Sequence, residues 1–244
     1  MMKLLAAWLV IIAAYAQVDP RDLFIGQYIL DLDSSGVVIA TVDEDGFIDF
    51  LFGYPNRPLV SSPPLPLSGG PSDYVIRYRD GDFDFIRDLI KRSAPEANIQ
   101  NGDFTELTGF SAVRFGTRFG GKKVDFRRSA LPLRPGKYRY TEGPSFTLTA
   151  YTTNANAATV VVDCGGRQLF QQIDDLVVSE RTNIYYAFAN PELPKFIADV
   201  AETCSRPDLL TSFSYFSVFS ATDDRVYMQL NGWDGPTFAL DRSE

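Results

Sequence analysis

The tripeptide Gly26-Gln27-Tyr28 returns about 110 residues later as Gly136-Lys137-Tyr138. Three further stretches return in the same order: 85–89 as 196–200, 107–111 as 210–214, and 124–126 as 226–228. The offset drifts only as small loop insertions would cause. A repeat this long indicates a duplicated domain, because solenoid units span roughly 20 to 50 residues.

Each copy has the pattern of strands, then one helix, then strands. Runs rich in β-branched and aromatic residues alternate with Gly-, Asp- and Pro-containing turns. We therefore predict an α+β fold of two tandem similar units, residues 17–133 and 134–244. Each unit is expected to be a strongly curved antiparallel β-sheet, or a partly open barrel, packed on one helix. The short join between the units predicts that they pack closely.

The helices are predicted from one-sided apolar spacing. The first should begin at Asp82 or Asp84 and bury four apolar residues: Phe85, Ile86, Leu89 and Ile90. The second should be capped by Asn190, with Cys204 on its inward face. The short run 237–240 is expected to add an edge strand.

The N-terminus has the pattern of a secretory signal peptide. Lys3 precedes the apolar run 4–14, and small residues follow at Ala14 and Ala16. We expect cleavage before Gln17, a secreted, extracellular protein, and no membrane span after cleavage. Loss of Lys3 takes the formal net charge from −8 to −9. An acidic chain of this kind disfavours nucleic acid as a partner.

The two cysteines, Cys164 and Cys204, invite pairing in an oxidising compartment. Both are missing from the matching positions of the first unit, where Phe52 and Ser93 stand, as expected for a bonded pair. We predict a disulfide between them.

The chain contains no histidine. That composition excludes Ser–His and Cys–His nucleophiles and imidazole-ligated metals. We expect no catalytic residues, no metal site and no cofactor. Asp31 to Gly36 imitates the start of a calcium loop, but Val42 stands where the bidentate glutamate belongs. We interpret this segment as a turn.

The sharpest local feature is a predicted hairpin over 113–128. With Gly120-Gly121 as a two-residue turn, one face carries four bases in two opposed pairs, Arg114 with Arg127 and Arg118 with Lys123. Like charges directly opposite destabilise a sheet. The face is therefore a candidate anion-binding site, for example for an extracellular protein or polysaccharide. The alternative is a solvated face neutralised by the protein's own acids.

From these observations we expect a secreted, non-catalytic binding or interaction protein of unknown ligand. One alternative is a carrier of an apolar, lipid-like ligand in a β-lined pocket. A lesser alternative is a carboxylate-based hydrolase, because two of the 31 acidic residues could converge.

Overall fold

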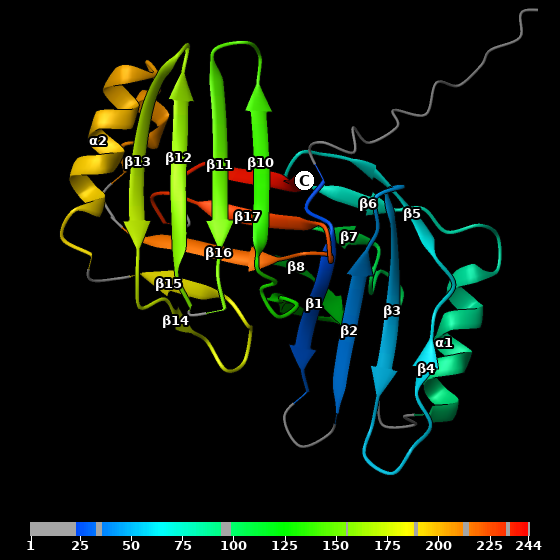
Figure 1. Cartoon of the computed structure of the whole chain (residues 1–244). Helices are drawn as coiled ribbons and strands as arrows, with labels where there is room; N and C mark the ends of the chain where they lie inside the picture. Colours follow the sequence, from blue (N-terminus) through cyan, green and yellow to red (C-terminus); the bar gives the residue numbers. More distant parts are fainter. Residues whose placement is uncertain are drawn as a thin grey trace, which may run out of the picture.

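A computed structural model describes residues 23–32, 36–93, 99–154, 156–187, 190–211, 215–232 and 235–243. The predicted signal peptide, 1–16, lies outside these residues. The chain forms two antiparallel, curled sheets, each with one helix (Figure 1). This confirms the predicted β-rich α+β fold. No helix in the described part of the chain is long and apolar enough to span a membrane.

The first sheet curls into a near-barrel. Its strand order is β7-β6-β5-β3-β2-β1-β9-β8, with β4 attached to β3. Thr108 and Gly116 exchange two backbone hydrogen bonds of 2.8 Å, which join the β7 end to β8. The elements are β1 (Gly26–Asp31), β2 (Val37–Val42), β3 (Phe47–Gly53), β4 (Val60–Ser61), β5 (Leu65–Gly69), β6 (Tyr74–Ile76), α1 (Asp82–Ser93), β7 (Glu106–Leu107), β8 (Arg114–Phe119) and β9 (Lys122–Ser129).

The second sheet is a half-barrel with the order β13-β12-β11-β10-β18-β17-β16-β15-β14. Its two ends, β13 and β14, are not paired with each other in the described residues. The elements are β10 (Gly136–Glu142), β11 (Phe146–Thr152), β12 (Ala158–Cys164), β13 (Arg167–Ile173), β14 (Val177–Val178), β15 (Tyr185–Ala187), α2 (Leu193–Thr203), the 3₁₀ helix η2 (Pro207–Leu209), β16 (Phe216–Ser220), β17 (Arg225–Gln229) and β18 (Thr237–Ser243).

Two helix predictions need correction. Phe85 was expected in the core, but it is 58% exposed and Phe83 packs inward against Tyr78 instead. Asn190 does not begin α2, which starts at Leu193. Its side-chain oxygen still accepts a hydrogen bond from the Glu192 N–H at 3.0 Å. Residues 190–192 therefore form a turn that precedes the first residue of α2.

Strand register relates the two units residue by residue. Tyr28 of β1 lies opposite Arg128 of β9, and Tyr138 of β10 lies opposite Arg242 of β18. The last strand, β18, is therefore the counterpart of β9. The prediction that 237–240 adds an edge strand was wrong, because β18 lies between β10 and β17. For the same reason, the sequence match of 124–126 with 226–228 paired the wrong strands: 124–126 lie in β9, whereas 226–228 lie in β17, the neighbour of β18.

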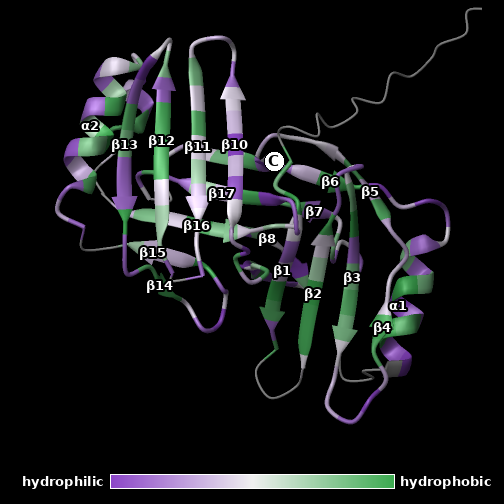
Figure 2. Ribbon diagram, in the orientation of Figure 1, coloured by the Kyte–Doolittle hydropathy of each residue, from purple (hydrophilic) through white to green (hydrophobic). Residues whose placement is uncertain are grey.

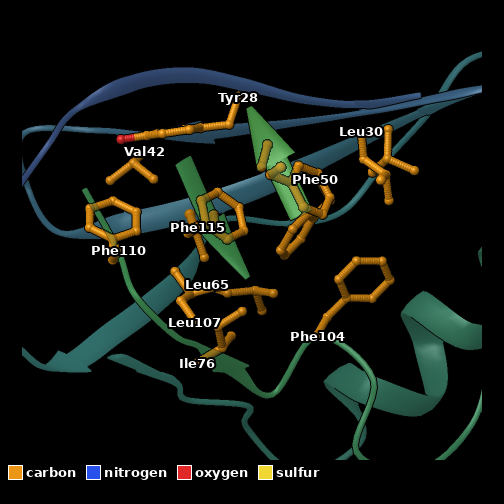
Figure 3. Packing of buried hydrophobic residues seen from close by; sticks show 14 of the residues in the cluster. Tyr28, Leu30, Val42, Phe50, Leu65, Ile76, Phe104, Leu107, Phe110 and Phe115 are labelled. Carbon is orange, nitrogen blue, oxygen red and sulfur yellow. The ribbon is translucent and has the colours of Figure 1, made fainter. Parts of the chain in front are cut away.

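Buried apolar side chains form one core cluster in each unit. The hydrophobic residues recur along the strands of both sheets, as the hydropathy colouring of the ribbon shows (Figure 2). In the first unit, aromatic rings and aliphatic side chains meet inside the barrel (Figure 3). Phe115 and Phe126 stack with centroids 4.8 Å apart, and Phe50 lies 4.7 Å from Phe104. Such ring pairs stabilise a core by about 0.5–1.5 kcal/mol beyond simple burial. The first barrel is thus a packed core.

The predicted disulfide is present. Cys164 at the end of β12 is bonded to Cys204, the C-cap of α2, with a Cα–Cα distance of 5.0 Å. The inward face of α2 carries Leu193, Phe196, Ile197, Val200 and Ala201, all buried. The bond therefore fastens the helix to the sheet of the half-barrel.

The two units are in contact along a seam. The Tyr227 hydroxyl of β17 accepts a hydrogen bond from the Ile25 N–H at 2.8 Å. Arg128, 1% exposed, lies 5.4 Å from the Tyr227 ring and 5.8 Å from the Phe219 ring. Ile184 of the second unit is buried in the first unit's core cluster. This confirms that the units pack closely.

Candidate anion-binding face

The hairpin β8–β9 has the predicted register. Arg114 lies opposite Arg127, and Arg118 lies opposite Lys123. The turn residues Gly120 and Gly121 have φ of 61° and 72°. Two successive positive φ values define the turn type that favours glycine and fits the twist of the flanking strands. The local sequence therefore fixes which side chains share a face.

A buried carboxylate holds this turn in place. Asp103 has no exposed surface, and its oxygens accept hydrogen bonds from the N–H groups of Gly120 at 2.8 Å and Gly121 at 3.0 Å. It accepts a third from the Gln100 N–H at 2.8 Å. Charge-assisted bonds of this kind are stronger than neutral ones. Sequence reasoning missed Asp103, because an Asp directly after Asn101 and Gly102 looks like an ordinary turn residue.

We call Arg114, Arg118, Lys123 and Arg127 the basic face. All four side chains are exposed. In the described part of the chain, no carboxylate forms an ion pair with any of them. Arg118 Nη2 donates a hydrogen bond to the Gly121 carbonyl at 3.1 Å. The structure thus brings the four predicted residues together, and none of the acids that it describes is bonded to them.

A hollow adjoins the Arg118–Lys123 pair. It is open to solvent, with a volume of about 280 Å³, and Gly116 forms part of its floor opposite Asp125. A Cβ at Gly116 would lie 3.0 Å from Thr108 Oγ1 and 3.4 Å from Asp125 Oδ1. The missing side chain therefore keeps the hollow open. The lining residues are Gly102, Thr105, Glu106, Thr108, Gly116, Thr117, Arg118, Lys123, Val124 and Asp125.

In the second unit, the residues at the same sheet positions form complementary side-chain pairs with each other. The ladder registers match Arg114 and Arg127 with Arg225 and Asp241, which form an ion pair with Nε to Oδ1 at 2.6 Å. This ion pair raises the pKa of Arg225 and keeps it charged.

The register also matches the second basic pair with an uncharged one. Arg118 and Lys123 correspond to Gln229 and Thr237, whose side chains are hydrogen-bonded at 2.9 Å. The scaffold therefore accommodates complementary pairs at both positions, and only the first unit has like charges there.

The two faces also differ in what covers them. Gly116 corresponds to Tyr227, which is 1% exposed and reaches across the seam to Ile25. Gln229, at the position of Arg118, is 2% exposed. In the second unit this surface of the hairpin is an internal interface. In the first unit the equivalent surface is open and basic.

The seam contains a charged group that the sequence did not single out. Arg128 Nε donates to the Ala112 carbonyl at 2.6 Å, Nη1 to the Ile25 carbonyl at 2.6 Å and Nη2 to the Tyr28 hydroxyl at 2.5 Å. Burial raises the pKa of Tyr28 far above its ordinary value, so the phenol stays neutral. Because the guanidinium of Arg128 is buried and its three donor atoms are hydrogen-bonded within the protein, we assign it a structural role.

Other candidate sites have less support. Among the described residues, no three His, Cys, Asp or Glu side chains come together as a metal site would require. The calcium-like segment 31–36 lies partly outside those residues, because 33–35 are not described.

Comparisons with known proteins leave the family open. No protein-family model matches the chain, and no curated protein matches its sequence. One solved structure with a match is DNA polymerase III subunit beta from Borrelia burgdorferi in complex with a natural product. The identity is 10% over 93% of this chain, which spans 60% of that chain, and the TM-score is 0.21. A likeness this weak carries no argument about fold or function.

Proposed function

We propose that this protein is a secreted, non-catalytic binding protein and that the basic face is where it takes an anionic group of its ligand. The observation that carries the proposal is the pair of cross-strand like-charge contacts, Arg114 with Arg127 and Arg118 with Lys123. Each such contact costs the free protein a few tenths of a kcal/mol to about 1 kcal/mol. A bound sulfate, phosphate or carboxylate would remove that repulsion.

The second unit supports this interpretation. Its Arg225–Asp241 ion pair and Gln229–Thr237 hydrogen bond stand at the same sheet positions. Because the same scaffold supports complementary pairs, the like charges of the first unit are not required by the fold. A ligand that needs positive charge gives them a reason to be there.

Neither alternative gains a specific observation. A lipid carrier needs an apolar cavity, but the first barrel is filled by its own side chains. Two larger cavities, of about 500 and 560 Å³, are open to solvent and lined by acids, including Asp174 and Asp175 in one and Asp223 and Asp224 in the other. A hydrolase needs two convergent carboxylates of shifted pKa. Asp49, whose pKa burial raises, neighbours Asp43 but lines none of these cavities.

Binding of dextran sulfate by the mature protein tests the proposal. Arg118→Glu with Lys123→Glu should weaken the affinity about tenfold or more and flatten its dependence on salt, because the charge change falls at the contact. Arg181→Glu with Lys195→Glu is the matched control, since both side chains are exposed on the second unit. An equal effect of the two double variants would reduce the interaction to net charge and reject the proposal.

Export is tested separately. The unmodified chain, expressed in a secreting host, should accumulate in the medium with Gln17 as its first residue. N-terminal sequencing reads this directly. A chain retained inside the cell with Met1 intact would contradict the expected signal peptide.

A further inference from the structure

We infer that the basic face is one elongated site with two anion subsites, and that its ligand is a linear acidic polysaccharide. This rests on the proposed function and names the ligand class of the same surface. The two subsites are the Arg118–Lys123 pair and the Arg114–Arg127 pair. Their positions are four residues apart along each strand, which is about 13 Å at roughly 3.3–3.4 Å per residue.

The space between the subsites repels a third anion. Asp125 lies opposite Gly116, midway between the two basic pairs, and no side chain of Gly116 offsets its charge. A ligand that fits must therefore carry its negative charges apart, with a neutral portion over Asp125. A single phosphate or sulfate would use only half of the site.

The hollow beside the first subsite has the polar groups that a sugar ring requires. The carboxylates of Glu106 and Asp125 can accept hydrogen bonds from ring hydroxyls, and Thr105 and Thr108 line the same space. Its volume of about 280 Å³ is near the lower end of ligand-binding clefts, roughly 300 Å³. Hydroxyl-bearing rings between sulfate or carboxylate groups match this alternation of base, acid and base.

An acidic peptide fits less well. Adjacent residues of an extended peptide are only about 3.3 Å apart, so a run of acids would place negative charge over Asp125. A second copy of the chain fits less well too. The second unit's hairpin contacts the first unit through Tyr227, and the first unit has Gly116 at that position. The basic face therefore lacks the aromatic anchor that makes the internal seam.

The test uses heparin-derived oligosaccharides of increasing length and the full mature protein. Affinity, measured by calorimetry, should rise about tenfold or more between a disaccharide and a hexasaccharide, as the second subsite becomes reachable. Inorganic sulfate and a poly-glutamate peptide of matched charge should bind more weakly than the hexasaccharide.

Variants copied from the second unit separate the subsites. Arg127→Asp recreates the Arg225–Asp241 pairing on Arg114, while Arg118→Gln with Lys123→Thr recreates the Gln229–Thr237 pairing. Each should abolish the length dependence, and neither should lower thermal stability, since each replaces a repulsion by a complementary contact. Arg114→Gln removes one positive charge from the same subsite without adding an acid. It replaces Arg127→Asp in the test if that variant does not fold.

The outcomes distinguish this inference from the proposed function. If the disaccharide binds as tightly as the hexasaccharide, or if Arg127→Asp and Arg114→Gln leave hexasaccharide affinity unchanged, the two-subsite inference is overturned while an anion-binding face remains. If poly-glutamate binds best, the ligand is an acidic protein and the polysaccharide assignment is overturned. If reversal of Arg118 and Lys123 also leaves binding unchanged, the proposed function itself fails.

Discussion

The guanidinium carbon of Arg128 lies 4.0 Å from the centroid of the Tyr28 ring, and the two residues are direct partners across the β1–β9 ladder. A cation held this way is 1% exposed, and the described residues supply it with carbonyls, a hydroxyl and aromatic rings rather than a carboxylate. Cation–π contacts to desolvated groups are worth about 2 kcal/mol or more. Through Arg128, the core of the first unit is therefore in contact with the aromatic rings of the second unit at the seam.

Arg128→Ala should lower the free energy of unfolding by about 3 kcal/mol or more, because it leaves three buried acceptors without a donor. The counterpart Arg242 is exposed, and its guanidinium Nη2 donates a hydrogen bond to the Pro135 carbonyl at 3.0 Å. Arg242→Ala should cost less than about 1 kcal/mol. Urea unfolding of both variants measures the difference, and similar losses would contradict the structural role assigned to Arg128.

Gly26→Ala should also be destabilising, by about 1–3 kcal/mol. Gly26 has φ of +109°, and a Cβ there would lie 2.5 Å from Arg128 Nη1 and 3.0 Å from the Ala221 carbonyl oxygen. The matched control is Gly136→Ala, whose Cβ would meet only the flexible end of Arg242 at 3.2 Å. Thermal melts of the two variants should separate clearly. A harmless Gly26→Ala would mean that the seam relaxes freely.

Removing the disulfide should destabilise the protein by about 4 kcal/mol, the value that the chain-entropy model gives for the 40-residue separation of Cys164 and Cys204. The double variant with serine at both positions replaces each sulfur by a smaller hydroxyl and removes the bond. Denaturant unfolding under oxidising and reducing conditions should converge for this variant and differ for the natural chain. If reduction leaves the stability of the natural chain unchanged, the bond does not stabilise the half-barrel.

Asp208 should make a small contribution to acid sensitivity. Hydrogen bonds from Arg206, with Nη2 to Oδ2 at 2.8 Å, hold the pKa of Asp208 below its usual value of 3.8. A depressed pKa stabilises the fold above the unfolded value, and that stability is lost as pH falls through the folded value. Asp208→Asn should therefore be less stable than the natural chain at neutral pH and equally stable in strong acid. The effect is small because the carboxylate is about half exposed, at 46%.

The parts of the fold that the sequence predicted are those set by local rules. Two adjacent glycines fixed the register of β8 and β9, so the composition of the basic face followed from counting. The one-sided spacing of α2 placed Cys204 toward the sheet, and its bond to Cys164 followed.

The predictions were wrong where contacts between residues distant in sequence determine which side chain is buried or which strands pair. Phe85 and Phe83 both fit a helical stripe near the start of α1, and only the neighbouring Tyr78 determines which one turns inward. The position of β18 depends on its pairing with β10, about 100 residues earlier in the chain. Similarly, Arg128 and Arg242 occupy equivalent positions in sequence pattern. Arg128 is buried where rings of the second unit, Phe219 and Tyr227, add to its partners in the first, while Arg242 is exposed.

The contact between the two units uses the outer surface of strands β17 and β18. The equivalent surface of β8 and β9 in the first unit is exposed. Because Tyr227 occupies the contact in the second unit and Gly116 stands in its place in the first, the two copies are under different constraints. One must keep its side chains to hold the molecule together, while the other can change without loss of assembly. A second similar unit thus provides a surface that the fold does not need, and a binding site placed there leaves the contact between the units intact.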